Sequence, residues 1–198
     1  MIVKPDGNRA LINYKGDTQV LAADAIDFSI IQPKVILFDG HEPNISVPLA
    51  EQARLLGIPT VLDAGSVHTG TLALMGLVDY LVCSEKFALQ LKGDEHSALA
   101  YLAILSPCVV ITLGESGLIW QRGAETGALP ALTINALDTT GAGDAFHGAF
   151  AAAVAAGFDW LTVLRYASVA GALCCTQMGA RLGLASKQEH EAVYRRGE

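Results

Sequence analysis

The run Cys108-Val109-Val110-Ile111-Thr112-Leu113 carries the strongest strand signal in the sequence and decides the fold class. It is a short apolar segment rich in β-branched residues, and it ends at Gly114. Beyond Gly117 follows Leu118-Ile119-Trp120-Gln121, which we expect to form an antiparallel partner. The stretch Leu113–Leu132 therefore predicts antiparallel strands at one edge of a sheet.

Upstream of this strand, strand and helix signals alternate. Further strands are predicted at Val35–Phe38, Thr60–Asp63 and Tyr80–Cys83, and helices at Val47–Leu56, Glu85–Leu91 and His96–Leu105. Strands that alternate with helices indicate parallel βαβ units with helices on both faces of the sheet. The chain is therefore predicted to be an α/β protein with a mostly parallel sheet.

The two ends of the chain carry different patterns. The N-terminal strands Ile2–Lys4 and Ala10–Tyr14 flank Asp6-Gly7, a turn pair that favours a hairpin. At the other end, helices are predicted at Asp144–Ala156, Trp160–Gln177 and Lys187–Arg195.

Several predicted strands end in polar residues or glycines. These ends are Asp39-Gly40, Asp63-Ala64-Gly65, Ser84 and Thr112-Leu113-Gly114. Ligands of open α/β sheets bind beyond the carboxyl ends of the strands. We therefore expect the active site at this rim.

Charge and composition exclude several classes of protein. The 198 residues include 13 Lys and Arg against 20 Asp and Glu, a net charge of −7, which argues against a nucleic-acid surface. The longest nearly uncharged stretch, Ala145–Gly157, is too short to span a membrane. The N-terminus lacks the pattern of a secretory signal. We expect a soluble, cytoplasmic protein.

Cysteine and histidine spacing predicts no protein-bound metal. The four cysteines form no C-x-x-C pair, and adjacent Cys174-Cys175 lie in an apolar stretch, so we expect reduced, buried thiols. The five histidines lack zinc-ligand spacing.

The chemistry is carried by Asp138-Thr139-Thr140-Gly141-Ala142-Gly143-Asp144. Its two glycines let successive backbone N–H groups turn inward and form an anion-binding nest, and the helix that follows adds the positive end of its dipole. Such a nest stabilises the charge of a phosphoryl group during transfer. The Asp144 carboxylate, ionised at neutral pH, can accept the proton of an attacking hydroxyl.

Other interpretations of this motif are weaker. A plain helix-entry turn with Asp144 as a dipole partner would explain the glycines alone. A dinucleotide fingerprint would need a third glycine at position 146, where Phe146 stands, and no Gly-Lys-Ser or Gly-Lys-Thr of a Walker motif occurs.

The segment Asp138–Phe150 resembles the C-terminal signature of the PfkB, or ribokinase-like, carbohydrate kinase family. Thr112–Gly117 is similar to the nucleotide-loop motif of that family, and the hairpin around Asp6-Gly7 to its small β lid. Ser84–Phe87 and Asp144–Gly148 resemble the sulfofructose kinase and ketohexokinase branch most. The resemblance implies a three-layer α/β/α fold with an antiparallel edge, and ATP and Mg²⁺ as cofactors.

The resemblance also implies roles for individual residues. Asp144 would be the catalytic base, and the backbone of Gly141, Ala142 and Gly143 the anion hole. The nucleotide would contact Thr112, Gly114, Gly117 and Ser84, and the sugar would contact Asn13, Asp39 and His41. Asn13 could equally be a solvated strand residue, Asp39 a turn-capping carboxylate and His41 a residue of a surface loop.

This sequence departs from the family pattern in two places. Ser84-Glu85-Lys86-Phe87 stands where relatives carry an Asn-x-x-Glu element that orders Mg²⁺, so the ion would be held mainly by phosphates and water. The strand, Gly-Gly segment and helix that open the family fold have no counterpart here. We expect residues 1–20 to be the remnant of the lid and residues 21–198 the nucleotide-binding and catalytic part. An exposed sheet edge would then favour self-association, and a homodimer is possible.

Three functions remain open at this point. The first is an ATP-dependent sugar kinase with Asp144 as base. The second is a catalytically incomplete, nucleotide-binding remnant or partner subunit. The third is a phosphosugar kinase of the phosphofructokinase-like branch. Such an enzyme would need additional cationic residues at the substrate rim, where this sequence offers only Arg9 and Lys15.

Overall fold

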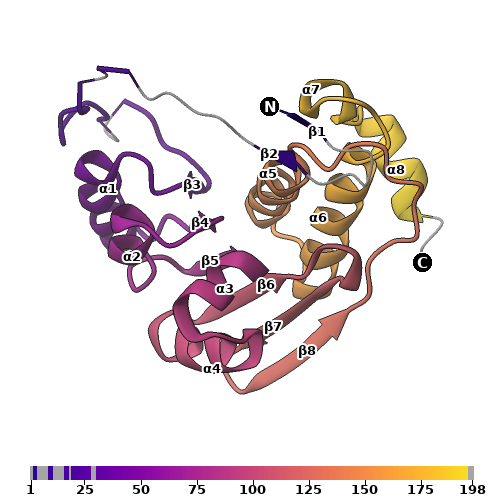
Figure 1. The fold of residues 1–198 in the computed structure, drawn as a ribbon. Coiled ribbons are helices and arrows are strands. Elements are labelled where there is room, and N and C mark those ends of the chain that lie inside the picture. The colour runs from indigo at the N-terminus through magenta and orange to yellow at the C-terminus, as the bar shows by residue number, and fades with distance from the viewer. Residues whose placement is uncertain (1, 4–8, 11–15, 18, 28–29, 196–198) are drawn as a thin grey trace. The chain divides into compact units, whose positions relative to one another are not determined.

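The chain folds into two compact units (Figure 1). The computed structural model describes residues 2–3, 9–10, 16–17, 19–27 and 30–195. The first unit, here called the motif unit, comprises Met1–Gln19, Leu132–Phe150 and Asp159–Glu198. The second, the sheet unit, comprises Val20–Ala131 and Ala151–Phe158.

The sheet unit is built on a six-stranded sheet with the order β3-β4-β5-β6-β7-β8. Its strands are β3 Ile36–Phe38, β4 Thr60–Ala64, β5 Tyr80–Ser84, β6 Cys108–Thr112, β7 Leu118–Arg122 and β8 Glu125–Leu129. The first four strands are parallel, and β7 and β8 continue the sheet antiparallel. The predicted antiparallel strands at one edge are thereby confirmed.

Four helices of the sheet unit pack against one face of this sheet. They are α1 Pro43–Leu56, α2 Thr69–Leu74, α3 Glu85–Lys92 and α4 Glu95–Leu105. Alternate strand residues such as Leu62, Leu81 and Val109 form one buried cluster with them. The strands follow one another in sequence order, so right-handed crossovers place these helices on the same side. On the opposite face Val61 and Val82 are equally buried.

Local signals explain where these helices begin and end. Gly57 ends α1 in the left-handed conformation, as its sequence position predicts. The side chains of Ser84 and Asp94 accept hydrogen bonds from the backbone N–H groups of Phe87 and Ser97, which caps α3 and α4.

The motif unit contains a short hairpin and a group of helices. Strand β1 Ile2–Val3 pairs antiparallel with β2 Arg9–Ala10. The predicted turn at Asp6-Gly7 and the rest of the predicted strand Ala10–Tyr14 lie outside the described residues. The helices are α5 Ala142–Ala155, whose residues from Ala151 belong to the sheet unit, α6 Trp160–Cys174, α7 Ala180–Gly183 and α8 Lys187–Tyr194.

The differences from the predicted elements are small. Helix α2 escaped prediction because its six residues are too few to show a helical period. Helix α6 ends at Cys174 rather than Gln177, because the chain turns there and the Cys175 carbonyl accepts the N–H groups of Leu137 and Asp138. All four cysteines are buried and free, as predicted.

Candidate active site

The loop that precedes α5 is organised by the buried carboxylate of Asp138. Its Oδ1 accepts hydrogen bonds from the backbone N–H of Thr140 at 2.9 Å and from the Thr140 hydroxyl at 2.6 Å. Its Oδ2 accepts the N–H of Gly179 at 2.8 Å. One side chain thus ties the motif loop to the segment that follows α6.

The C-terminal end of α6 packs against the same loop and the start of α5. Gly171 packs so closely on α5 that an added Cβ would lie 3.2 Å from the Ala142 carbonyl oxygen. The Cys174 thiol lies 3.5 Å from the Thr140 carbonyl oxygen. Burial raises the pKa of this thiol, and the negative charges of Asp144 and Asp138 raise it further. Cys174 is therefore a neutral thiol at physiological pH, and not a nucleophile.

The glycine-rich turn leads directly into α5. Gly141 has a φ of +80°, which glycine adopts without strain, and its α-carbon faces Ala180 so closely that a side chain would collide with it. Helix α5 begins at Ala142, so Asp144 is its third residue and is exposed. The His147 Nδ1 lies 2.7 Å from the Gly143 carbonyl oxygen and must carry the proton, because a carbonyl only accepts.

This arrangement presents backbone N–H groups and a carboxylate at the same helix end. The first N–H groups of an α-helix have no acceptor within the helix, and its dipole favours anions there. Asp144 is in the first turn of α5. Gly141, Ala142, Gly143 and Asp144 thus lie at the start of α5, where the Ala142 N–H donates to the Thr139 carbonyl at 3.3 Å; whether they hold an anion stays a prediction.

In the sheet unit, the predicted rim residues share one end of the sheet. Asp39 follows β3, Ser84 ends β5, and Thr112 ends β6, and these strands run parallel. Ser84 and Thr112 are paired across β5 and β6. Three strand spacings of about 4.8 Å separate β3 from β6, so the Asp39 and Thr112 ends lie roughly 14 Å apart along the rim.

The loop after β6 is tightly folded. The Thr112 hydroxyl donates to the Cys83 carbonyl at 3.3 Å, and the Leu113 N–H donates to the Gly117 carbonyl at 2.7 Å. Gly114 and Gly117 both have positive φ, +58° and +90°. The Ser84 hydroxyl donates to the Gly65 carbonyl at 2.9 Å, which links the ends of β4 and β5.

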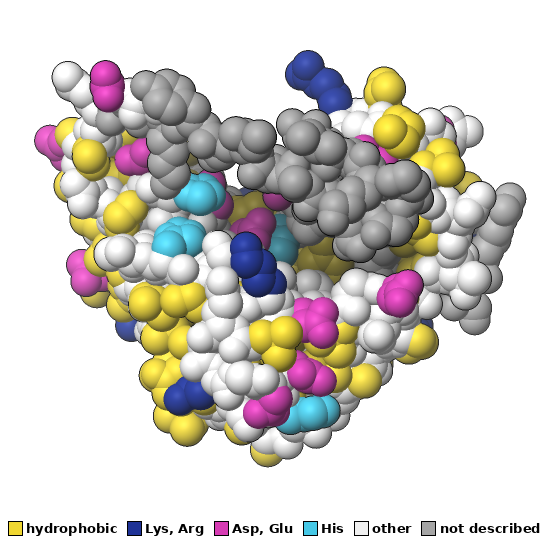
Figure 2. Space-filling view, viewed as in Figure 1, with side chains coloured by type: hydrophobic (Ala, Val, Ile, Leu, Met, Phe, Trp, Pro, Cys, Tyr) yellow, Lys and Arg dark blue, Asp and Glu magenta, His cyan; other side chains and the backbone are white. Residues whose placement is uncertain are grey.

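At the β3 end of the rim, the loop residue Asp39 accepts the backbone N–H of His41 at 2.9 Å. A carboxylate has about four acceptor positions, so this bond leaves Asp39 able to accept more. The ring of His41 stacks on that of His68. Figure 2 shows histidine side chains side by side on the face that it draws. Asn13 lies outside the described residues.

Sequence reasoning assigned no role to Asp138 or His68. Asp138 opens the motif, but only the fold reveals that its carboxylate reaches Gly179, 41 residues away. His68 precedes a helix that the sequence did not predict, so no pattern could have indicated its stacking partner.

The described residues contain no group of three or more His, Cys, Asp or Glu side chains placed to hold a metal. Within those residues, no helix combines the length and apolar character that crossing a bilayer requires. Glu85, the acid of the Ser84–Phe87 segment, lies exposed in the first turn of α3.

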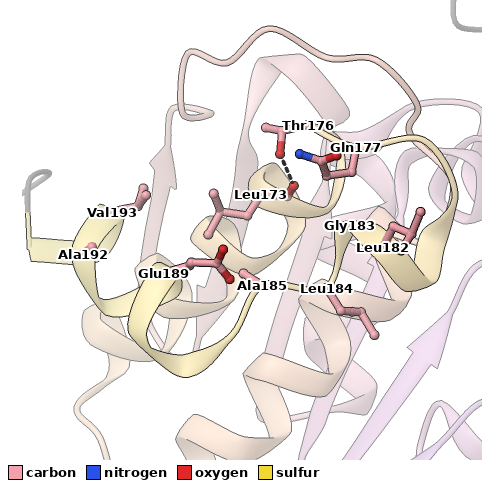
Figure 3. A pocket seen from close by; sticks show the side chains of 10 residues that line it. All are labelled: Leu173, Thr176, Gln177, Leu182, Gly183, Leu184, Ala185, Glu189, Ala192 and Val193. Atoms are coloured by element: carbon pink, nitrogen blue, oxygen red, sulfur yellow. Dashed lines mark hydrogen bonds between the residues drawn. The ribbon is translucent and has the colours of Figure 1, made fainter.

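A groove of about 380 Å³ lies between the end of α6, α7 and α8 (Figure 3). Two of its polar groups are engaged locally: the Thr176 hydroxyl donates to the Leu173 carbonyl, and Glu189 accepts from Ser186. The exposed Gln177 also lines the groove. The remaining lining is mostly apolar, including Leu173, Leu182 and Leu184. The groove is therefore lined mainly by apolar side chains.

The chain is similar to known proteins over most of its length. The model of the pfkB family carbohydrate kinases matches residues 2–187. The ribokinase of Haemophilus influenzae is 29% identical over 169 residues, covering 81% of this chain and 55% of the relative. Three bacterial ribokinases are matched over 55%, 67% and 63% of their own length, so the chain spans little more than half to two thirds of them.

Solved structures show the same fold. The crystal structure of the Thermotoga maritima ribokinase superposes with a TM-score of 0.80 at 23% identity, covering 88% of this chain and 61% of that one. The Arabidopsis thaliana ribokinase, solved with ribose and ATP, gives a TM-score of 0.74 at 26% identity, covering 82% and 56%. The ribokinase-like α/β/α fold class predicted from the sequence is confirmed.

Proposed function

Because this chain belongs to the PfkB family of carbohydrate kinases, we propose that it transfers the γ-phosphate of ATP to a hydroxyl group of a sugar. The observation that carries the proposal is the geometry around α5. A glycine turn fixed by Asp138 leads into a helix whose first turn exposes Asp144. Phosphoryl transfer to an alcohol needs an anion site beside a base, and this geometry supports such a role for the start of α5.

In this proposal Asp144 is the base. Its carboxylate accepts the proton of the attacking sugar hydroxyl as the new P–O bond forms and the bond to the ADP oxygen breaks. The backbone of Gly141, Ala142 and Gly143 forms the anion hole that stabilises the charge on the transferred group. The transition state of phosphoryl transfer is loose, so Asp144 contributes mainly by orienting the hydroxyl.

The nucleotide would enter as MgATP. Thr112, Gly114 and Gly117 would line its adenosine-diphosphate side, and Ser84 would act by fixing the turn after β5, since its hydroxyl already bonds Gly65 and Phe87. No described cluster would cage the metal. Mg²⁺ is commonly held by nucleotide phosphates and water with few protein ligands, which is compatible with this site.

The sugar would contact Asp39 and His41 at the end of β3, and Asn13 of the N-terminal hairpin. Asp39 suits this role because an ionised carboxylate accepts hydrogen bonds from hydroxyls. The Asp39 carboxylate is exposed and held by its bond to the His41 N–H.

A second candidate is a nucleotide-binding chain that is catalytically incomplete. It is favoured by Ser84-Glu85-Lys86-Phe87, which lacks the glutamate of the Asn-x-x-Glu element. A homodimer would be compatible with either function.

The test is a coupled assay of ADP release with MgATP and a panel of acceptors: D-ribose, D-fructose, a 2-keto-3-deoxy sugar acid and inosine. Calorimetry with MgATP accompanies it. Acceptor-dependent ADP release supports the kinase. MgATP binding without any release across the panel would favour the second candidate, and absence of both would contradict the two.

A further inference from the structure

Two histidines form a defined pair at the rim of the sheet unit. The rings of His41 and His68 are nearly parallel, 8° apart, with centroids separated by 5.2 Å. His41 follows β3, and His68 lies between β4 and α2. Both therefore follow the carboxyl ends of adjacent parallel strands, where ligands of open α/β sheets bind.

The backbone beneath the two rings fixes their spacing. A Cβ added to Gly70 would clash with the Gly40 carbonyl oxygen. A Cβ added to Gly40 would lie 3.0 Å from the His68 Cε1 and 2.9 Å from the Thr71 nitrogen. Gly40 and Gly70 are also buried. The loop after β3 thus docks on the first turn of α2 only because both positions lack side chains.

Hydrogen bonds anchor both loops. The His41 N–H donates to Asp39 Oδ1 at 2.9 Å, and the His68 N–H donates to Thr71 Oγ1 at 3.1 Å. The Thr71 side chain is fully buried, and its hydroxyl lies 3.0 Å from the Ser66 carbonyl. The two imidazoles are therefore presented by ordered backbone, with His41 exposed and His68 half-buried.

The chemistry of this pair differs from that of a carboxylate. A neutral imidazole carries one donor and one acceptor nitrogen, whereas an ionised carboxylate only accepts. A sugar hydroxyl both donates and accepts. The His68 side chain already accepts the Thr71 N–H at the start of α2, so a contact from His68 to a hydroxyl would use its other ring nitrogen, as a donor. The two imidazoles at a fixed spacing beside Asp39 can therefore discriminate the arrangement of neighbouring hydroxyls, because a site built to bond a hydroxyl strongly rejects an analogue that lacks it.

We propose that His41 and His68 act together as one element that contacts the hydroxyls of the acceptor sugar and determines which sugar is accepted. The inference rests on the proposed kinase function and extends it, since it adds His68 to the acceptor site and couples it to His41. Substitution of either ring removes the contact of that ring and the stacking that orients the other.

The test measures acceptor binding and turnover separately. The Cε1–H resonances of His41 and His68 are followed by NMR while D-ribose, D-fructose, a 2-keto-3-deoxy sugar acid or inosine is added without nucleotide. The variants His41→Gln, His68→Gln, their double variant and His68→Phe, which keeps a stacked ring without nitrogens, are then assayed. His96→Gln is the control, because His96 is an exposed histidine of α4 in the same unit.

We expect both resonances to shift with the same saturation curve for the preferred acceptor. Loss of one hydrogen-bonded contact should raise the acceptor Kd and KM roughly tenfold with kcat changed less than about twofold. The double variant should raise the acceptor Kd by less than the product of the two single fold-changes, because the rings are coupled. His96→Gln should match the wild type, and Asp144→Asn should retain both shifts.

The outcomes separate this inference from the proposed function. An acceptor that is phosphorylated with unchanged KM in His68→Gln or His68→Phe would overturn the inference and leave the kinase intact. An acceptor that binds with shifts of both histidine resonances but is never phosphorylated would support the acceptor role of His41 and His68 and would contradict the proposed kinase function. No binding by any member of the panel would count against both.

Discussion

At the residue scale, the Asp138 carboxylate holds the motif loop in shape. It is almost fully buried and accepts hydrogen bonds from the N–H and hydroxyl of Thr140 and from the N–H of Gly179. A buried carboxylate costs solvation free energy that these bonds must offset, and removing it would leave their donors unsatisfied.

Asp138→Ala should therefore lower the free energy of unfolding by roughly 2–4 kcal/mol, because it leaves backbone N–H donors without their acceptor and creates a cavity. Urea unfolding measures the change. The control Asp24→Ala removes an exposed carboxylate and should stay within about 0.5 kcal/mol of the wild type. A loss of less than about 1 kcal/mol in Asp138→Ala would contradict the structural role of this side chain.

The glycine turn and the position of Asp144 near the start of a helix could be predicted from the sequence, because the motif that carries them is contiguous. It could not predict the bond between Asp138 and Gly179 or the stacking of His41 on His68, because each contact joins segments that meet only in the folded chain. The roles of all these site residues stay predictions until binding and turnover are measured, and they include Asp144, the glycine turn Gly141–Gly143, and the residues assigned to the nucleotide and the sugar.

At the scale of single elements, the helices depend on their first residues. Asp159 caps α6, where its Oδ1 accepts the Thr162 N–H and its Oδ2 the Thr162 hydroxyl. These hydrogen bonds hold the pKa of the Asp159 carboxyl below its usual value. The same helix ends at Cys174, and Cys174 and the following Cys175 both contact the segment around the motif loop.

This lowered pKa predicts an acid-dependent stability. A depressed folded pKa means that the stabilisation by Asp159 is complete above the unfolded pKa of about 3.9 and is lost as the pH falls through the folded value. Asp159→Asn cannot titrate, so the difference in urea midpoint between wild type and variant should shrink between pH 7 and pH 3. A difference for Asp159→Asn that stays constant with pH would refute the linkage.

A second element-scale prediction concerns the docking of the β3 loop on α2. Gly70→Ala should reduce stability by about 1–3 kcal/mol, because the new methyl group overlaps the Gly40 carbonyl oxygen. Gly76→Ala is the matched control, since nothing lies within 4 Å of its added Cβ. Equal urea midpoints for the two variants would show that the approach of Gly40 to Gly70 is not close.

The alternating strands and helices of the sheet unit were predictable because each carries its own periodic pattern. Helix α2 was not, and neither was the start of α1 at Pro43, because short or proline-containing segments lack that signal. The early end of α6 arises from tertiary hydrogen bonds to the Cys175 carbonyl, which overrule the apolar run through Gln177.

At the scale of the whole molecule, the edge strand β3 of the sheet affects whether copies of the chain associate. In the described part of the chain β3 pairs with β4 alone, and its Leu37 side chain is 41% exposed. An exposed edge strand with an apolar side chain favours pairing between chains.

We therefore expect the chain to self-associate with rising concentration in light scattering coupled to size-exclusion chromatography. Leu37→Lys should weaken this association, because a lysine on an edge strand opposes edge-to-edge pairing. Leu55→Lys changes an equally apolar and more exposed residue of α1 and should leave it unaltered. A wild-type chain that stays monomeric throughout would contradict the role of the β3 edge.

The most direct test of the central claim compares turnover and nucleotide affinity in the wild type and in Asp144→Asn, with the acceptor that the panel identifies. If Asp144 is the base, kcat should fall by about 10²–10⁴ while the calorimetric Kd for MgATP changes less than about threefold, since proton transfer is lost and the anion hole remains. A variant that keeps the wild-type kcat would show that Asp144 is not the base and that this site does not work as proposed.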